Sequence, residues 1–408
     1  MPTSNETECF SAIDWAKDAH AVAVLDATGS ELIAREFAHS EEGLRELTAT
    51  LLAAGARRVA LERPDGLLCD RLLAAGLCVV AVHPNKLASA RERHSASGKK
   101  SDRFDAYVLA DLLRTDGHRF PSLRPDGDET KAIRALSRTR EDLVKTRVAL
   151  ANQLRAQLEA CWAGAAVVFA EVDSPIALAF IARYPSPHDA RALGEKRLAS
   201  FLGRHSYCGR RSPAELLARL RAAPEASCGE VEAEARRQAV LALVAVLGPL
   251  VEQIKLLEAE LGQAVRTHAD GELFGSLFKT KAAVCAAALL GEIGDVRGRY
   301  PSAHALAADA GMVPVSKSSG RSRTVSFRWA CDKRLRAAVA CLADTTRHHH
   351  PWAQSVYRRA RARGCDHQHA IRILGRAWLR VIWRMWQDRV PYDPSLHRGL
   401  QQLNPVGG

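Results

Sequence analysis

Four acidic residues, Asp14, Glu62, Asp102 and Asp105, occupy positions that suit a metal-binding site. Asp14 closes an apolar, strand-like segment, and Glu62 closes a second one. Strand interiors disfavour Asp, and a buried carboxylate without a partner is costly, so the pattern indicates a compensating cation. Asp102 and Asp105 are three residues apart near the start of a predicted helix, so both project from one face. Converging carboxylates bind Mg²⁺ or Mn²⁺ and can hold a two-metal phosphoryl-transfer site.

A second candidate for chemistry is Ser319, which lies in a predicted loop at residues 314–326. A Ser-Ser-Gly segment alone usually forms only a flexible loop. Serine attack on phosphorus would form a phosphoserine ester and conserve the phosphodiester energy, so DNA ends could be rejoined without ATP. Basic side chains close to either candidate in the sequence favour phosphate binding, although solvated loops explain them as well: Lys99, Lys100, Lys317, Arg321, Arg323 and Arg328.

The N-terminal third is predicted to alternate strands and helices that would position the carboxylates. The expected strands are 10–14, 21–25, 32–37, 58–61 and 79–82, and the expected helices are 40–54, 67–75 and 86–94. The order β-β-β-α-β-α-β-α is that of an RNase H-like sheet. In such a sheet, the strand ends at one edge and a following helix bring carboxylates together.

The remainder is predicted to be mainly helical, which makes the whole chain α/β plus all-α. Leucines repeat every seven residues in 127–162, and apolar residues recur every three or four in 240–261, with a break or kink expected at Pro249. The two helices are expected to pair as an antiparallel coiled coil, although an ordinary helical bundle explains the pattern equally. The predicted domains are 1–125, 126–268 with an inserted helical segment at 163–235, 269–395, and a tail at 396–408.

Composition indicates a polyanionic partner. The 408-residue chain has a net charge of +12, which favours binding to nucleic acid. Residues 1–60 carry five Lys/Arg against ten Asp/Glu, whereas residues 314–400 carry eighteen against five, so the C-terminal part is the better candidate. The ten cysteines form no C-x-x-C pair, and neither a signal peptide nor a run of about eighteen uncharged apolar residues occurs. We therefore expect a cytoplasmic protein that does not enter a membrane.

Residues 370–386 alternate tryptophans with arginines in a predicted helix. Such a face can stack bases and grip phosphates, but such tryptophans more often belong to the core. We expect the tryptophans, among them Trp378, Trp383 and Trp386, to be core residues and the arginines to contact nucleic acid. The histidines at 348–350 and 367–369 are expected to be surface groups or RNA contacts rather than metal ligands.

Together, these residues resemble the DEDD transposases of the insertion-sequence one-ten family, which are bridge-RNA-guided serine recombinases. The resemblance runs over nearly the whole chain. It rests on Asp14, Glu62, Asp102-x-x-Asp105-Ala106, Ala310-Gly311-x-x-Pro314, Ser319-Gly320, Arg334-Leu-Arg336-x-Ala338 and Val390-Pro-Tyr-Asp393. It implies a RuvC-like catalytic domain at 1–125, a coiled-coil domain and a C-terminal transposase domain.

The resemblance also implies roles and partners. The four carboxylates would bind Mg²⁺, with Mn²⁺ as a substitute, and Ser319 would be the nucleophile, contributed by a neighbouring protomer. A bridge RNA would pair with donor and target DNA. Dimers of the protein would assemble into tetramers in the bacterial cytoplasm. Two departures stand out: Lys279 and Lys281 occupy a turn that is glycine-rich in relatives, and Phe327-Arg-Trp329 replaces a Lys-x-Gly turn. The two lysines could contact phosphate by charge instead.

Three other functions remain open from the sequence. A RuvC-like hydrolytic nuclease or junction resolvase would need the carboxylates without Ser319. A tyrosine recombinase is suggested by His369-Ala-Ile-Arg372 and Tyr392, but its further arginine is not identifiable and the carboxylates would be unexplained. A non-enzymatic RNA- or DNA-binding protein would need neither group.

Overall fold

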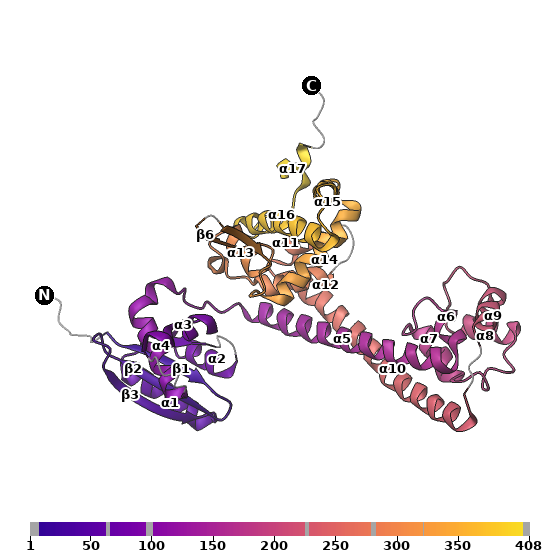
Figure 1. Ribbon diagram of the computed structural model, residues 1–408, viewed down its shortest axis with the longest axis horizontal. Helices are drawn as coiled ribbons and strands as arrows, with labels where there is room; N and C mark the ends of the chain where they lie inside the picture. Colours follow the sequence, from indigo (N-terminus) through magenta and orange to yellow (C-terminus); the bar gives the residue numbers. More distant parts are fainter. Residues whose placement is uncertain are drawn as a thin grey trace. The chain divides into compact units, whose positions relative to one another are not determined.

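The structure is a computed structural model that describes residues 8–62, 66–94, 101–224, 228–278, 283–320 and 322–402, without the side chains of residues 322 and 323. The chain divides into two compact units, residues 1–125 and residues 126–408 (Figure 1). The finer division of residues 126–408 stays a prediction.

The first unit is built on a five-stranded mixed sheet with the strand order β3-β2-β1-β4-β5. β1, β2 and β3 form an antiparallel meander, and β4 and β5 run parallel to β1. The strands are β1 Phe10–Trp15, β2 Ala19–Leu25, β3 Glu31–Ala38, β4 Arg58–Leu61 and β5 Cys78–Ala81. The helices are α1 Glu41–Ala53, α2 Leu67–Ala74, α3 Pro84–His94 and α4 Asp102–Asp116. The expected strand and helix order of this unit is confirmed.

Helices cover both faces of this sheet and make a three-layer α/β/α unit. On one face, Ile13 belongs to the core formed with α1 and α2. On the other face, Ala12 and Ala60 belong to the core formed with α3 and α4. Successive side chains of a strand point to opposite faces, so Asp14 and Glu62, two residues after Ala12 and Ala60, continue toward the α3/α4 face.

The position of α4 is fixed at its start and along its length. The Ser101 hydroxyl accepts a hydrogen bond from the backbone N–H of Phe104 (3.2 Å), so the helix begins at Asp102. Further along, the buried carboxylate of Asp111 pairs with Arg114 (2.6 Å) and with the imidazole of His94 (3.1 Å). His94 is the last residue of α3. Asp111 therefore joins α3 to α4.

The second unit is organised around two long helices, α5 Asp128–Cys161 and α10 Glu230–Thr267. Arg140 pairs with Glu258 (2.6 Å), and Arg236 donates to Gln157 (3.1 Å), which shows that the helices run antiparallel. One end of the pair carries α6 Ala163–Val168, α7 Pro175–Arg183, α8 Glu195–Arg204 and α9 Pro213–Ala222. The other end packs with the C-terminal helices α11 Gly271–Gly275, α12 Ala283–Ile293, α13 Ala303–Asp309, α14 Lys333–His349, α15 Pro351–Ala362, α16 His367–Asp388 and α17 Arg398–Gln401.

α10 is continuous through Pro249, so a break there, one of the two alternatives expected from the sequence, is wrong, and a kink stays a prediction. Proline removes the hydrogen bond to the carbonyl four residues earlier. That residue, Ala245, is exposed, so water can satisfy its carbonyl. Within the described part of the chain, α10 is the one helix that is long and apolar enough to cross a membrane by length and composition. Its buried Val240, Leu247 and Ile254 are accounted for by packing inside this unit.

The segment expected as a loop at 314–326 instead forms a β-hairpin. β6 Val315–Ser319 pairs antiparallel with β7 Ser322–Ser326, and Ser319 lies opposite Ser322. Gly320 has φ of +53°, as the first residue of a tight hairpin turn requires. The strands were missed because their residues are mostly polar and carry no apolar alternation. The tryptophan prediction is confirmed: Trp378 and Trp386 are fully buried, and Trp383 packs against the same core.

Asp126, the first residue of the second unit, is predicted to be a major contributor to stability. Its side chain is fully buried and pairs with Arg134 and with Arg299 (2.6 Å). Burial raises the pKa of Asp126, but the two arginines outweigh this and hold the pKa below its ordinary value. Asp126→Asn leaves both guanidinium groups without their carboxylate. We expect it to lower the free energy of unfolding at pH 7 by about 3 kcal/mol, measured by urea denaturation.

Asp128→Asn is the matched control for this change. Asp128 is exposed in the first turn of α5, so its substitution costs less than about 1 kcal/mol through the helix dipole. The Asp126 contribution is present above pH 4 and is lost as the pH falls through the depressed folded-state pKa. Equal stability losses in the two variants would contradict this assignment.

Candidate active site

The structure brings the four predicted carboxylates together in one pocket of the first unit. Asp14 ends β1, and Glu62 directly follows β4, one step beyond the paired residues Ile13 and Leu61. The first turn of α4 adds Asp102 and Asp105. The pocket has a volume of about 300 Å³ and is lined by Asp14, Trp15, Glu62, Pro84, Arg91, Asp102 and Asp105. Two parallel strand ends and one helix start therefore present four carboxylates to one small space.

The crowded negative charge acts most strongly on Asp14. Burial, together with the carboxylates of Asp105, Asp102 and Glu62, raises its pKa from 3.8 to about 7. The positive charge of Arg91 lowers this pKa but does not cancel the effect. Near neutral pH the pocket therefore holds part of its Asp14 population protonated, which is the response expected of a carboxylate cluster that lacks a counterion.

Arg91 is a member of this pocket that sequence reasoning missed. It lies near the end of α3, and its guanidinium binds Asp105 through two hydrogen bonds, from Nε to Oδ1 (2.5 Å) and from Nη2 to Oδ2 (2.6 Å). Asp105 is only 1% exposed, and this pair compensates its burial. The sequence showed that residues 86–94 are basic, but it did not show which arginine faces the carboxylates.

The donor set fits a hard divalent cation. Carboxylate oxygens are the ligands that Mg²⁺ and Mn²⁺ prefer, and the raised pKa of Asp14 shows negative charge still to be compensated. Across the described residues, no three His, Cys, Asp or Glu side chains already have the spacing to hold a metal ion.

Ser319 belongs to the second unit, at the exposed end of β6. Lys317 is also exposed on this strand. Arg328 follows β7, and its Nε donates to the carbonyl of Val313 (3.2 Å), which holds the base of the hairpin. Five other basic residues predicted to contact nucleic acid lie outside the described residues: Lys99, Lys100, Lys279, Lys281 and Arg321. Only the backbone of Arg323 is described, as part of β7.

The hairpin is positioned by Arg336, on α14. Its Nη2 donates to the carbonyl of Arg328 (2.5 Å), and its guanidinium lies 4.5 Å from the centre of the Phe327 ring. The guanidinium also packs against Gly311, where a Cβ atom would come within 2.7 Å of Arg336 Nε. Gly311 has φ of +63°, a conformation that other residues rarely adopt. The contact between Gly311 and Arg336 therefore fixes the position of the chain segment that follows β7.

Tyr392, the nucleophile of the tyrosine-recombinase alternative, is engaged in a partly buried hydrogen-bond network. Its hydroxyl bonds with His350 (2.8 Å) and His397 (2.7 Å). Burial and the charge of Asp393 raise its pKa to about 12. A phenol held protonated in this way is a poor nucleophile, so the geometry does not favour this alternative.

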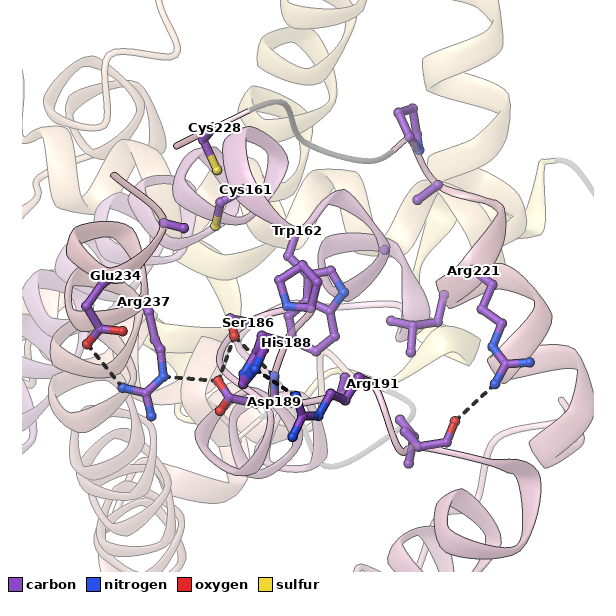
Figure 2. A pocket seen from close by; sticks show the side chains of 18 of the residues that line it. Cys161, Trp162, Ser186, His188, Asp189, Arg191, Arg221, Cys228, Glu234 and Arg237 are labelled. Carbon is purple, nitrogen blue, oxygen red and sulfur yellow. Dashed lines mark hydrogen bonds and ion pairs between the residues drawn. The ribbon is translucent and has the colours of Figure 1, made fainter. Parts of the chain in front are cut away.

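A larger cavity, of about 1120 Å³, lies in the helical module of the second unit (Figure 2). Several of its polar side chains pair with one another. Asp189 accepts hydrogen bonds from Ser186 (2.7 Å) and Arg237 (3.0 Å), and Arg191 contacts His188 (3.0 Å). Figure 2 shows these side chains turned toward one another along the wall. None of the predicted site residues lines this cavity, and its paired groups explain it as part of the fold.

Comparison with known proteins identifies the family. A family model described as a transposase, of the DEDD type of IS110, matches residues 12–163, and a second, described as the transposase IS116/IS110/IS902 family, matches residues 281–358. The putative transposase of the IS117 mini-circle of Streptomyces coelicolor is 32% identical over 403 residues, covering 94% of this chain and 95% of that protein. The chain belongs to the IS110 family of transposases. It is therefore a DNA-cleaving and recombining enzyme.

Other relatives align over almost the same length. The uncharacterized 44.8 kDa protein of insertion element IS116 from Streptomyces clavuligerus is 28% identical, covering 94% of this transposase and 96% of the relative. The uncharacterized 43.6 kDa protein of insertion element IS110 from Streptomyces coelicolor is 27% identical, covering 98% and 99%. The first family match contains Asp14, Glu62, Asp102 and Asp105, and the second contains Ser319. Membership in this DEDD family indicates dependence on a divalent metal ion.

We expect Asp14→Asn to stabilise the metal-free transposase at pH 8. The folded-state pKa of Asp14 lies above its unfolded value of 3.8, so ionisation opposes folding. The cost develops as the pH rises from about 4 to about 7 and remains above that. Asn removes this cost, and the free energy of unfolding should rise by about 1–2 kcal/mol. The gain is smaller than the full pKa change implies, because the side chain stays partly open to water.

The measurement is urea denaturation in EDTA at pH 8 and at pH 5, where the gain should shrink. Asp18→Asn is the control, since Asp18 is exposed in the turn between β1 and β2. A loss of stability in Asp14→Asn at pH 8 would show that the carboxylate cluster is compensated without metal.

Gly311→Ala tests how the Ser319 hairpin is positioned. The new methyl group meets the Arg336 guanidinium, and the backbone conformation is unfavourable for alanine. Gly364 also has positive φ (+85°) but open space at its Cβ position, so Gly364→Ala carries the same backbone strain alone, about 1–2 kcal/mol. We expect Gly311→Ala to reduce recombination at least tenfold more than Gly364→Ala, measured on a donor–target plasmid pair. Equal activities would show that the Arg336 contact is dispensable.

Proposed function

We propose that this transposase cuts and rejoins the DNA of an insertion sequence through a phosphoserine intermediate. Mg²⁺ would be held by Asp14, Glu62, Asp102 and Asp105. The observation that carries the proposal is the convergence of these four carboxylates in one pocket of about 300 Å³. The strand order of the first unit supports an RNase H-like, RuvC-type domain, in which such a pocket lies at the strand ends.

Each residue has a defined task in the proposed reaction. Asp14, Glu62, Asp102 and Asp105 would hold the ion, which would supply Lewis-acid polarisation of the scissile phosphate. Arg91 holds Asp105 in the pocket through its two hydrogen bonds. The Ser319 oxygen attacks phosphorus in line, and the bond to the departing sugar oxygen breaks. The serine loses its proton and the departing oxygen gains one, and the reverse attack rejoins the strand.

The resemblance to serine recombinases extends the proposal to partners. A bridge RNA would select donor and target DNA by base pairing, and dimers would assemble into tetramers in the bacterial cytoplasm, so that one protomer's Ser319 serves another's carboxylates. The separate placement of Ser319 and the carboxylates in two compact units is compatible with assembly of the site between protomers. The surplus of basic residues at 314–400 supports nucleic-acid binding by the second unit.

Ser319→Ala should abolish both the covalent adduct and strand exchange. The assay uses full-length protein, RNA from the flanking element, a suicide donor–target DNA pair and Mg²⁺. The adduct is mapped by mass spectrometry. Ser318→Ala is the matched control, because Ser318 is an exposed serine on the same strand and should retain adduct formation within about twofold.

Asp102→Asn should also lose the adduct, since it removes one oxygen ligand and one negative charge. Cleavage that persists in Ser319→Ala without an adduct would replace the proposal by a hydrolytic RuvC-like nuclease or junction resolvase. Adduct formation that survives EDTA would refute the metal site.

A further inference from the structure

Trp329 is exposed in a way that no role described so far explains. It lies between β7 and α14 and is 76% exposed, whereas Trp378 and Trp386 are fully buried and Trp162 and Trp352 are less than a tenth exposed. An exposed indole forgoes a large hydrophobic gain, because it is among the largest apolar groups in a protein. Single exposed apolar residues are common, so exposure alone decides nothing.

The surroundings of Trp329 show that its position is organised. Its ring meets the ring of Phe327 edge to face, with centroids 4.9 Å apart and an interplanar angle of 81°. Phe327 lies beneath two guanidinium groups, Arg336 at 4.5 Å and Arg372 at 5.0 Å. Arg336 also binds the carbonyl of Arg328, between the two aromatic residues. The connection that presents Trp329 is therefore held by α14 and α16.

This arrangement combines an open aromatic face with positive charge. Arg336 and Arg372 flank Phe327, and exposed Lys333 begins α14. Proteins that bind single-stranded nucleic acid use this combination, in which a base stacks on the aromatic ring and cations track the backbone. We propose that Trp329 stacks on an unpaired base of the DNA strand that is cut at Ser319.

Continuity with the hairpin favours DNA as the occupant. Trp329 follows β7, whose partner strand β6 ends at Ser319. Trp329 comes three residues after the last residue of β7, so it is on the same short stretch of chain as the hairpin that carries Ser319. Trp329 therefore contacts a base near the scissile phosphate. This inference rests on the proposed role of Ser319 for the identity of the strand.

A second copy of the chain is a poorer occupant for this surface. A stable protein interface buries about 800 Å² on each partner, far more than one indole provides. Two copies meeting face to face would also bring Arg336, Arg372 and Lys333 against the same charges, which is unfavourable.

The test measures binding without cleavage. Fluorescence anisotropy of a fluorescein-labelled 20-nucleotide single-stranded DNA is recorded with full-length protein in EDTA, at several salt concentrations. Trp329→Ala should weaken binding about 5- to 150-fold, the range for loss of one stacked base. Trp329→Phe should stay within about threefold, because it keeps an aromatic face, and Trp329→Leu should behave like Trp329→Ala.

Two controls separate stacking from charge and from general surface effects. Val325→Ala truncates another exposed apolar side chain, on β7, and should leave the affinity unchanged. The salt dependence of binding should keep its slope in Trp329→Ala, since no phosphate contact is lost, while Lys317→Ala should reduce the slope by about one. Unchanged melting temperatures confirm that the variants fold.

Several results would overturn the inference. Unchanged DNA affinity in Trp329→Ala refutes it. If Trp329→Ala weakens binding only to an RNA of the same sequence, the Trp329 ring contacts RNA instead. If the variant changes the sedimentation of the protein but not its DNA affinity, the ring contacts a second copy of the chain. Because the assay contains no metal and measures no cleavage, failure of the phosphoserine mechanism leaves the binding result intact, and the two failures are distinguishable.

Discussion

The mutual repulsion of four carboxylates is the constraint on which the first unit depends. Like charges in a small, partly dry pocket oppose folding unless rigid elements hold them. Here the sheet supplies Asp14 and Glu62, the capped start of α4 supplies Asp102 and Asp105, and Arg91 offsets part of the charge. The apolar layers on both faces of the sheet stabilise this arrangement, so the hydrophobic core supports a site that is itself unfavourable.

The same constraint explains why Asp111 and Asp105 differ although both are buried on α4. Asp111 is enclosed by Arg114 and His94 and serves to attach α3. Asp105 is paired with Arg91 and lines the pocket that also contains Asp14, Glu62 and Asp102. Both carboxylates have cationic partners, but only Asp105 lies beside other carboxylates.

The sequence predicted the first unit well because most of its strands are apolar runs and some of its helices have capping residues, such as Ser40 before α1 and Ser101 before α4. The convergence of Asp14 and Glu62 at the strand ends followed from those strands. Arg91 could not be selected, because its partner is fourteen residues away and only packing of α3 on α4 brings them together. The hairpin formed by β6 and β7 was missed because the described side chains of its strands are mostly exposed and polar. The expected break at Pro249 is absent because an exposed carbonyl tolerates the missing hydrogen bond.

The antiparallel pairing of α5 and α10 has a consequence for how the chain can vary. The helical module leaves α5 after Cys161 and returns to α10 at Glu230, and Cys161 and Glu230 line the same cavity, so the entry and exit of the module are neighbours. A segment with adjacent ends can gain, lose or exchange residues while the helices that carry it keep their alignment. The module is therefore a natural place for insertions, deletions and grafted domains.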